Sequence, residues 1–439
     1  MLEDTRFLWP ETSGRGLGGC GLSLFGTGRD GTGIGWPTYA LERERWRAEL
    51  AYLLGMPYWG QACTTEAARG MAQFGFEELG LHRIYAFAMT KNRASARVRR
   101  ANVLKRGGGV ATNASERLMG LAARCVDELP LVNKRYAFVG GSVGRGDADG
   151  WSDVDVTVCV DGGELPRTAN LVYEGELVQV DFVSPLPFEE VEHALVDYRF
   201  LLESRPVYDP RGEFRDLRED VHRRLGARSG RQKLFEQWRL VVEERKRWAN
   251  DSIDHRRLHS AAAAGGAAWT DAAFMVMFFG QGTSSTGALI PTMQRLSGIF
   301  GDYTRICRWL TISLGDIPER LRAVEHLRAH LRMRSPDRAD DFSLSPLQDI
   351  LNAQKAKRLT AHGELTNLAW QLAGEAFWLY LETANGLSID DYLATLPSGL
   401  GRALETIGLA GLDASAVQEL CAMADGLVRM AEQSCFRGV

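Results

Sequence analysis

The chain has 439 residues, 45% of them hydrophobic and 25% charged, a composition typical of a soluble globular protein of two or three domains. The formal net charge of −4 disfavours a nucleic acid as partner, because such proteins carry clustered positive charge. Seven scattered cysteines without a Cys-x-x-Cys motif exclude a disulfide framework and indicate reduced thiols. No apolar run approaches the roughly twenty residues of a membrane span, and the first residues do not form a signal peptide. A cytoplasmic protein without a membrane partner is therefore expected.

Residues 1–47 are dense in glycine, and apolar residues do not recur there with a clear period. Such a segment can bury little surface. We therefore predict a glycine-rich, irregular or loosely attached segment.

Residues 48–98 show regular patterns again. Glu49–Leu54 is predicted to be a strand, Thr64 or Thr65 can cap a helix that runs to about Leu79, and His82–Met89 is predicted to be a second strand. The next stretch, from Asn92, is predicted to open another helix.

This pattern, with Trp-Gly-Gln at 59–61 before a helix start, resembles the coenzyme A-binding half of a GNAT-type N-acetyltransferase over about 49–98. The resemblance implies that backbone N–H groups at the helix start bind the pyrophosphate of acetyl-CoA. That family usually has glycine where this chain has Ala62, and several of its strands are not evident. We therefore interpret the segment as a truncated acetyltransferase fragment.

Residues 99–114 form a linker by composition, and Glu116 to about Leu129 is predicted to be a helix that packs beneath a sheet. The apolar run Tyr136–Val139 is predicted to be a buried strand. A Gly-Gly-Ser turn at 140–142 then leads into a short helix, which Ser142 can cap.

Two aspartates begin the next predicted strand. Asp153 and Asp155 are two residues apart, so on a strand they point to the same face. Asp181 lies in the apolar run Leu177–Val183, which we pair with 169–174 through a turn at Gly175. Adjacent carboxylates repel each other unless a cation lies between them, and Mg²⁺ prefers such hard oxygen ligands.

These features resemble the DNA polymerase β-type nucleotidyltransferase superfamily, particularly its minimal and antibiotic-modifying members, over about 118–209. The alternative is a glycine-rich hairpin with acids at strand ends. The resemblance implies the following sites: a catalytic Mg²⁺ site at Asp153, Asp155 and Asp181, and a site for the triphosphate of an NTP donor, such as ATP, at Gly141, Ser142 and Arg145.

The rest of the chain is helical by pattern. Eight helices are predicted, over 231–250, 267–279, 287–314, 317–333, 345–359, 364–385, 389–395 and 414–433. Residues 188–204 are also predicted to be helical, and 206–210 to be a turn. The tryptophans among these helices are interpreted as core residues rather than a platform for a nucleobase.

The predicted fold class is α+β: a small mixed-sheet nucleotidyltransferase core at 115–225 and an all-helical C-terminal domain at 226–439, preceded by the partial GNAT-like α/β fragment at 48–98. His255 with His259, and His326 with His330, are predicted to lie on solvated helix faces rather than to bind zinc. Glu243, Glu244 and Asp251 are candidates for a general base, with ordinary surface charge as the alternative.

The leading hypothesis is Mg²⁺-dependent transfer of a nucleoside monophosphate from an NTP to a hydroxyl of a small acceptor, of the aminoglycoside antibiotic type by family analogy. The first alternative is GNAT-type acetyl transfer from acetyl-CoA, alone or as a second activity. The second alternative is a non-catalytic, nucleotide-binding interaction module.

Overall fold

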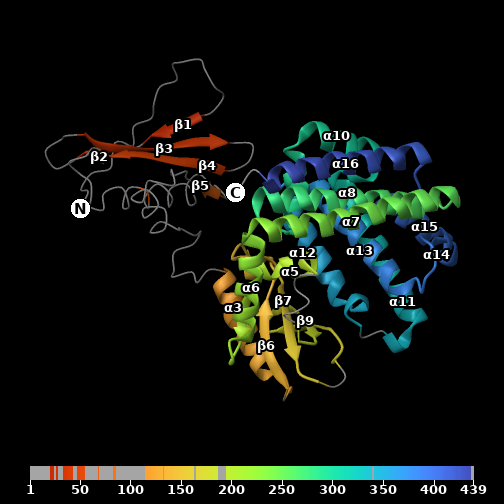
Figure 1. The fold of residues 1–439 in the computed structure, drawn as a ribbon, viewed down its shortest axis with the longest axis horizontal. Helices are drawn as coiled ribbons and strands as arrows, with labels where there is room; N and C mark the ends of the chain where they lie inside the picture. The colour runs from red at the N-terminus through yellow and green to blue at the C-terminus, as the bar shows by residue number, and fades with distance from the viewer. Residues whose placement is uncertain are drawn as a thin grey trace. The chain divides into compact units, whose positions relative to one another are not determined.

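The computed structural model describes residues 114–436 apart from 132, 163–164, 186–193 and 339–340 (Figure 1). Of the first 113 residues it describes five strands and the helical position Ala68. The chain divides into two compact units, Met1–Ala111 and Thr112–Val439.

The described residues of the first unit include one sheet. Its strands are β1 (Cys20–Ser23), β2 (Gly26–Thr27), β3 (Gly33–Glu42), β4 (Arg47–Leu54) and β5 (Arg83–Tyr85). Strand β3 pairs antiparallel with β1, β2 and β4, and β4 pairs parallel with β5.

The expectation that residues 1–47 are irregular is therefore wrong for the strands described there, and the rest of the segment lies outside the described residues. The interior of β3 carries Trp36, Thr38 and Tyr39, which favour strands. Strand β4 pairs with β3 along all of β4, and the glycine content of the segment does not reveal these hydrogen bonds. The predicted strand at 49–54 corresponds to β4. Of the strand predicted at 82–89, the structure describes Arg83–Tyr85, which forms β5. The helix predicted from Thr64 lies outside the described residues except for Ala68.

The second unit is built on a mixed sheet in the order β10-β6-β7-β9-β8. Its strands are β6 (Lys134–Val139), β7 (Val154–Val160), β8 (Ala169–Tyr173), β9 (Glu176–Val183) and β10 (Arg205–Tyr208). Strands β7 and β9 are parallel, and every other pair is antiparallel. The predicted strands and the 175 turn are confirmed. The turn predicted at 206–210 is wrong for Pro206–Tyr208, because β10 is an edge strand, where proline's missing N–H is tolerated.

Helix α3 (Ala114–Glu128) covers one face of this sheet, as predicted. Its residues Leu118 and Ala122 are fully buried together with Val154, Val156 and Val158 of β7. The opposite face packs against the helical region: the rings of Phe138 and Phe214 stack with centroids 4.5 Å apart. Alternation along β7 therefore directs its odd-numbered residues, including Asp155, to the helical side.

The helical region extends to residue 436. Its helices are α5 (Leu195–Tyr198), α6 (Glu213–Gly226), α7 (Arg228–Asp254), α8 (Leu258–Gln281), α9 (Thr286–Gln294), α10 (Ser297–Ile306), α11 (Ile317–Arg334), α12 (Leu347–Ala361), α13 (Leu365–Thr383), α14 (Ile389–Thr395), α15 (Ser398–Leu404) and α16 (Ala414–Phe436). The second unit is thus mostly helical, with one small mixed sheet.

The predicted helices correspond to most of these. Residues 287–314 break into α9, α10 and a short 3-10 helix, and α6 and α15 were not predicted. The helix predicted at 188–204 begins outside the described residues. Its described part is α5 and a 3-10 helix over Arg199–Glu203.

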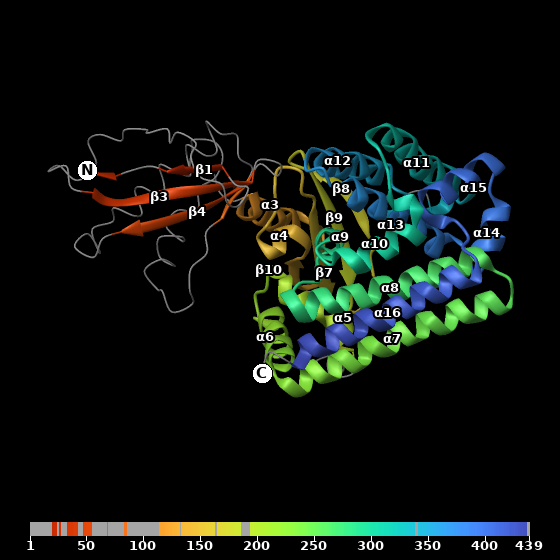
Figure 2. The ribbon, with the colours of Figure 1, turned by 90° about the horizontal axis from the view of Figure 1, so that it is seen from above.

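Helices α7, α8 and α16 lie side by side (Figures 1 and 2). Among the described residues, α8 alone is long and apolar enough to cross a membrane by length and composition, which corrects the expectation that no stretch approaches a span. Half of its most apolar window is buried, as in a core helix. Trp269 of α8 stacks on Tyr303 at 3.6 Å, which confirms the core interpretation for that tryptophan. Trp248 and Trp378 are half exposed and depart from it.

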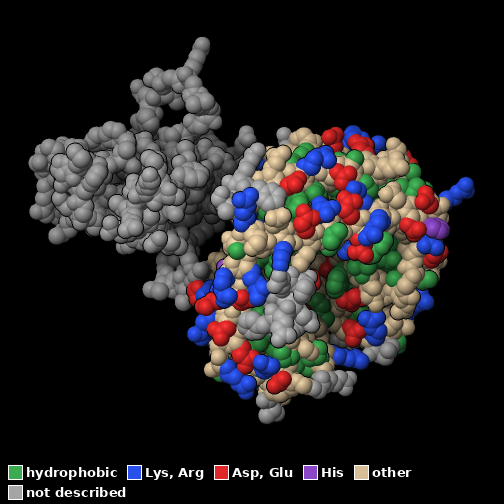
Figure 3. Space-filling model, viewed as in Figure 1, with side chains coloured by type: hydrophobic (Ala, Val, Ile, Leu, Met, Phe, Trp, Pro, Cys, Tyr) green, Lys and Arg blue, Asp and Glu red, His purple; other side chains and the backbone are tan. Residues whose placement is uncertain are grey.

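On the face of the second unit seen in Figure 3, acidic and basic side chains are interspersed among the described residues. The five cysteines of the second unit are free and buried: Cys125, Cys159, Cys307, Cys421 and Cys435.

Candidate active site

The turn after β6 is shaped by glycines. The N–H of Gly140 donates to the carbonyl of Asp155 at 3.0 Å, which ties the turn to β7. Gly141 has φ of +57°, and a Cβ there would lie 2.0 Å from Asp155 Oδ2. Helix α4 (Gly141–Arg145) then begins. Only glycine allows the backbone to approach the Asp155 carboxylate this closely.

The structure corrects the predicted cap. The N-cap of α4 is Gly140, without a side-chain cap, and Ser142 lies within the helix. A Cβ on Gly144 would lie 2.4 Å from the Val139 carbonyl oxygen, so α4 is pressed against the end of β6. The tightness of the turn, rather than a side-chain cap, sets where the helix begins.

The strand register decides how the three acids lie. In the parallel pair, Asp155 of β7 is opposite Gln179 of β9, and Thr157 is opposite Asp181. Residues opposite each other in a parallel pair point to the same side, so Asp155 and Asp181 share one face. Asp153, just before β7, has the same parity as Asp155. The face is the one opposite α3.

The pKa of Asp155 also reflects how close the other two acids are. Burial, followed by the negative charge of Asp153, raises the pKa of Asp155 from 3.8 to about 7. Asp181 adds to the rise, while Lys355 and Arg145 oppose it. A carboxylate in this position is costly without a nearby cation, because burial and like charge both disfavour its ionised form.

Lys355 of α12 is a site residue that the sequence analysis missed. It belongs to the basic run at 355–358. The charge of this run is visible in the sequence, but its position near Asp155 is not. Helix α12 lies beside β8 (Figure 2). Nearby contacts fix this arrangement: Asn170 Nδ2 donates to the Phe342 carbonyl at 3.0 Å, and Arg358 lies 3.9 Å from Asp149. The helical region thus places a cation over the acidic face.

Arg145 lies at the end of α4 and is itself flanked by acids. Its guanidinium is 3.4 Å from Asp147 and 3.8 Å from Glu203. With Arg205 and Arg218 it lines a cavity of about 600 Å³ beside α4. A group of positive side chains therefore adjoins the turn, and Arg145 also influences Asp155.

The donor set fits a hard cation, although the side chains are not closed around one. Asp181 is exposed, and its Oδ1 accepts from Thr168 Oγ1 at 2.5 Å. Within the described part of the chain, no three His, Cys, Asp or Glu side chains are grouped so as to hold an ion as placed. Three carboxylates on one face nonetheless provide the oxygen ligands that Mg²⁺ prefers, and Asp155 already responds to both of the others.

The candidate bases of α7 have other partners. Glu243 binds Lys246 Nζ at 3.1 Å, and the same nitrogen lies 2.6 Å from Asp425 of α16. Asp251 lies 3.5 Å from the ring of His255. These contacts favour the surface-charge alternative for Glu243 and Asp251.

The histidine pairs do not form metal sites among the described residues. His255 follows α7 as its C-cap and His259 lies in α8, so they do not share a helix. The prediction that His259 lies on a solvated helix face is wrong. Its Nδ1 lies 2.9 Å from Asp390 and its Nε2 3.1 Å from Glu405. Its environment is a polar contact between helices.

A family model for the acetyltransferase (GNAT) domain matches residues 4–102. The match covers under a quarter of the chain and begins well before residue 49, so the resemblance extends through the glycine-rich segment. It coincides with β1–β5, which corrects the view that the upstream strands are missing. No curated protein matches this chain.

Proposed function

We propose that the chain joins two transferase units: an acetyltransferase-like unit at the N-terminus and a nucleotidyltransferase at 112–439. The family match supports the first assignment and is compatible only with transferase chemistry in general for the second. The nucleotidyltransferase assignment rests on the geometry of its candidate site.

The observation that carries the second assignment is the shared face of the three acids. Asp155 and Asp181 lie two positions apart across parallel strands, and Asp153 precedes Asp155 on the same side. Together with the tight Gly141 turn, this arrangement supports the predicted nucleotidyltransferase core. A structural hairpin has no need to accumulate negative charge around a half-buried carboxylate.

In the proposed reaction, Asp153, Asp155 and Asp181 would hold Mg²⁺, which when bound supplies Lewis-acid stabilisation of phosphoryl charge. Lys355 and Arg145 would bind the phosphates of an NTP such as ATP and neutralise the charge on the leaving pyrophosphate. Gly141 and Ser142, where the chain turns, would orient the same phosphates.

The acceptor would supply the attacking hydroxyl. A small hydroxylated molecule is proposed, with an aminoglycoside as one candidate by analogy. Asp181 is exposed, unlike Asp153 and Asp155, which are half-buried. The proposed acceptor side is therefore the edge of the sheet near Asp181.

The test is mass spectrometry of a panel of hydroxylated acceptors incubated with ATP, Mg²⁺ and the protein. We expect one acceptor to gain the mass of AMP and Asp153→Asn to lower the rate about 100-fold or more, since even ligand-supporting residues cost 10–100-fold. Asp161→Asn, an exposed acid beyond β7, is the matched control. Equal turnover by Asp153→Asn and the native protein would refute the assignment.

Acetyl transfer by the first unit is a second candidate, favoured by the family match over residues 4–102. Binding of acetyl-CoA to the full chain, measured by calorimetry, tests it. If neither acetyl-CoA nor Mg²⁺-ATP binds with turnover, the non-catalytic module becomes the better description.

A further inference from the structure

A groove separate from the acidic face lies between α7, α8 and α13 in the second unit. It encloses about 890 Å³, within the size range of small-molecule sites. Its floor is α8, which contributes Ala263, Ala264 and Ala267. The small side chains leave the groove open, while the other side of α8 is packed: a Cβ on Gly265 would meet Val417 at 3.3 Å.

Aromatic side chains form the walls. Trp248 of α7 is 50% exposed although it lines the groove, and Phe377 and Tyr380 of α13 line it from the other side. The Phe377 and Tyr380 ring centroids are 5.8 Å apart. Leu381 and Leu387 add exposed apolar surface at 53% and 42%. Such walls suit a flat apolar body, because aromatic faces contribute both burial and stacking.

The charged residues of the groove are two arginines and one aspartate. Arg245 Nε lies 3.5 Å from Asp271 Oδ2, and its guanidinium lies over the Trp248 ring at 4.7 Å. These contacts neutralise Asp271 and hold Trp248 in place. Arg257, exposed at the rim, has no ion pair within the described part of the chain. The residues that line the groove therefore carry a net positive charge.

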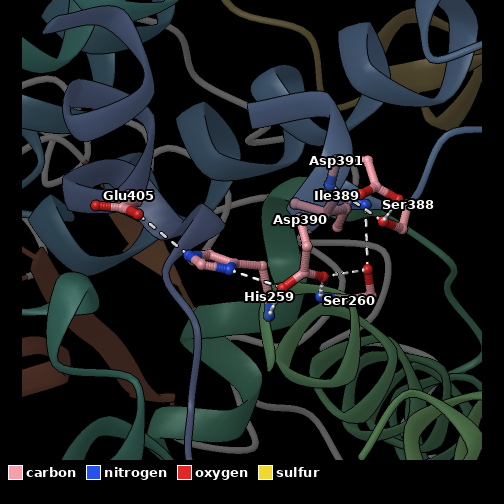
Figure 4. A network of polar contacts seen from close by, with 7 residues as sticks. All are labelled: His259, Ser260, Ser388, Ile389, Asp390, Asp391 and Glu405. Atoms are coloured by element: carbon pink, nitrogen blue, oxygen red, sulfur yellow. Dashed lines mark hydrogen bonds and ion pairs between the residues drawn. The ribbon is translucent and has the colours of Figure 1, made fainter. Parts of the chain in front are cut away.

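One end of the groove is fixed by the network drawn in Figure 4. Asp390 accepts hydrogen bonds from the backbone N–H groups of His259 and Ser260 and from Ser260 Oγ. Ser260 Oγ in turn accepts from Ile389 N at 3.1 Å. Tyr380 Oη donates to the Leu387 carbonyl at 2.8 Å. The wall made by 386–389 is thereby tied to the start of α8, so the groove is pre-formed rather than created by a ligand.

We infer that this groove binds a small organic anion with a flat apolar body, such as an aryl carboxylate or an aryl phosphate. The apolar body would lie on α8 between Trp248 and Tyr380, and the anionic group would contact Arg257. The inference does not depend on the proposed acetyl or nucleotidyl transfer. It uses the shape, the aromatic walls and the position of Arg257 at the rim.

The test is calorimetric titration of the full chain with four naphthalene probes of similar size. 1-Naphthoate and 1-naphthyl phosphate are anionic, 1-naphthamide is neutral, and 1-naphthylmethylamine is cationic. We expect both anions to bind at least tenfold more tightly than the amide, and the amine to bind most weakly. Tighter binding of the phosphate than the carboxylate would identify a phosphate as the anionic group, and the reverse order a carboxylate. Equal binding of all four probes, or binding of none, would overturn the inference.

Two pairs of variants locate the site. Arg257→Gln should weaken the anions about tenfold and leave the amide unchanged, whereas Arg256→Gln, which removes the same charge outside the groove, should change neither. Ala267→Leu fills the floor and should abolish binding, whereas Gly266→Leu adds bulk where a Cβ meets nothing within 4 Å. Thermal unfolding checks that each variant is folded. Unchanged naphthoate affinity in both folded Arg257→Gln and folded Ala267→Leu would contradict the assignment.

Discussion

Asp155 links the chemistry of the site to its stability. Its pKa is raised from 3.8 to about 7 by burial and by Asp153. Between these two pH values, the folded state therefore holds a proton that the unfolded chain has released. Stability attributable to this group is therefore present below pH 4 and is lost as pH rises from about 4 to 7. A bound divalent ion would replace the proton above that range.

We therefore predict that Asp155→Asn stabilises the protein at pH 8 in a chelator by about 1 to 4 kcal/mol, since one pKa unit corresponds to 1.36 kcal/mol. Chemical denaturation at pH 5 and pH 8 measures it. Mg²⁺ should raise the stability of the native protein at pH 8 and leave the variant unchanged. A variant no more stable than the native protein at pH 8 would show that ionisation of Asp155 does not destabilise the folded state.

Gly141 is predicted to be irreplaceable for a geometric reason. An alanine there would adopt φ of +57° and place Cβ 2.0 Å from Asp155 Oδ2, which costs at least about 1 kcal/mol for the backbone alone. Gly141→Ala should lower both stability and Mg²⁺ affinity. Gly150→Ala, where a Cβ meets nothing within 4 Å, is the control and should change neither. Similar losses in the two variants would contradict the account of the turn.

The contact between Asp390 and the start of α8 is predicted to be sensitive to acid. Burial opposes its ionisation, but hydrogen bonds from Ser260 and His259 lower the pKa of Asp390 to about 2. Its contribution is present above pH 4 and is lost as pH falls from 4 towards 2. Asp390→Asn should cost about 1 to 2 kcal/mol at pH 7 after allowance for its partial exposure, and nothing at pH 2. An equal cost of the variant at pH 7 and pH 2, measured by denaturation, would show that ionisation of Asp390 does not cause the stabilisation.

At the scale of elements, α12 completes the candidate site by bringing Lys355 over the acids of β7 and β9. Lys355→Gln should weaken ATP binding about tenfold, because a charge-assisted contact is lost, and raise the pKa of Asp155 further. Lys357→Gln, two residues along and exposed, should bind ATP normally. The comparison is made by calorimetry with Mg²⁺-ATP. If the two variants bind alike, α12 does not face the nucleotide.

The elements also show what the sequence could predict. Alternation of valine and aspartate predicted β7 and the side on which Asp153 and Asp155 lie, because the strand period is two. The same rule predicted Asp181 on β9, since its apolar neighbours needed a buried face. Lys355 could not be predicted in this way. It reaches the site through the packing of α12 beside β8, two hundred residues from β7 in sequence, and no local pattern encodes that contact.

The prediction for the strands within the first 47 residues was wrong for a different reason. Composition predicted irregular structure, but β4 pairs with residues 35–42 of β3 along its whole length, and such pairing outweighs local preference. The prediction that Ser142 caps helix α4 was wrong because Gly140 occupies the N-cap position. Local rules thus located the acids and the sheet, and missed features set by pairing between segments.

At the scale of the molecule, the division into Met1–Ala111 and Thr112–Val439 predicts separable ligand responses. Residues 112–439 expressed alone should unfold cooperatively. Mg²⁺-ATP at 100 times its Kd should stabilise both this piece and the full chain by about 2.7 kcal/mol. Acetyl-CoA should stabilise only the full chain. Thermal unfolding measures all four cases, and stabilisation of the isolated piece by acetyl-CoA would contradict the assignment of the two units.

Anomalous diffraction from crystals grown with Mn²⁺ and a non-hydrolysable ATP analogue would probe the acidic face directly. We expect a Mn²⁺ peak within coordination distance of carboxylate oxygens of Asp153 and Asp155, with Asp181 beside a second ion or its bound water, and the triphosphate between these ions and Lys355. Manganese bound elsewhere, with the three carboxylates free of metal and the nucleotide distant from β7, would contradict the proposed nucleotidyltransferase site.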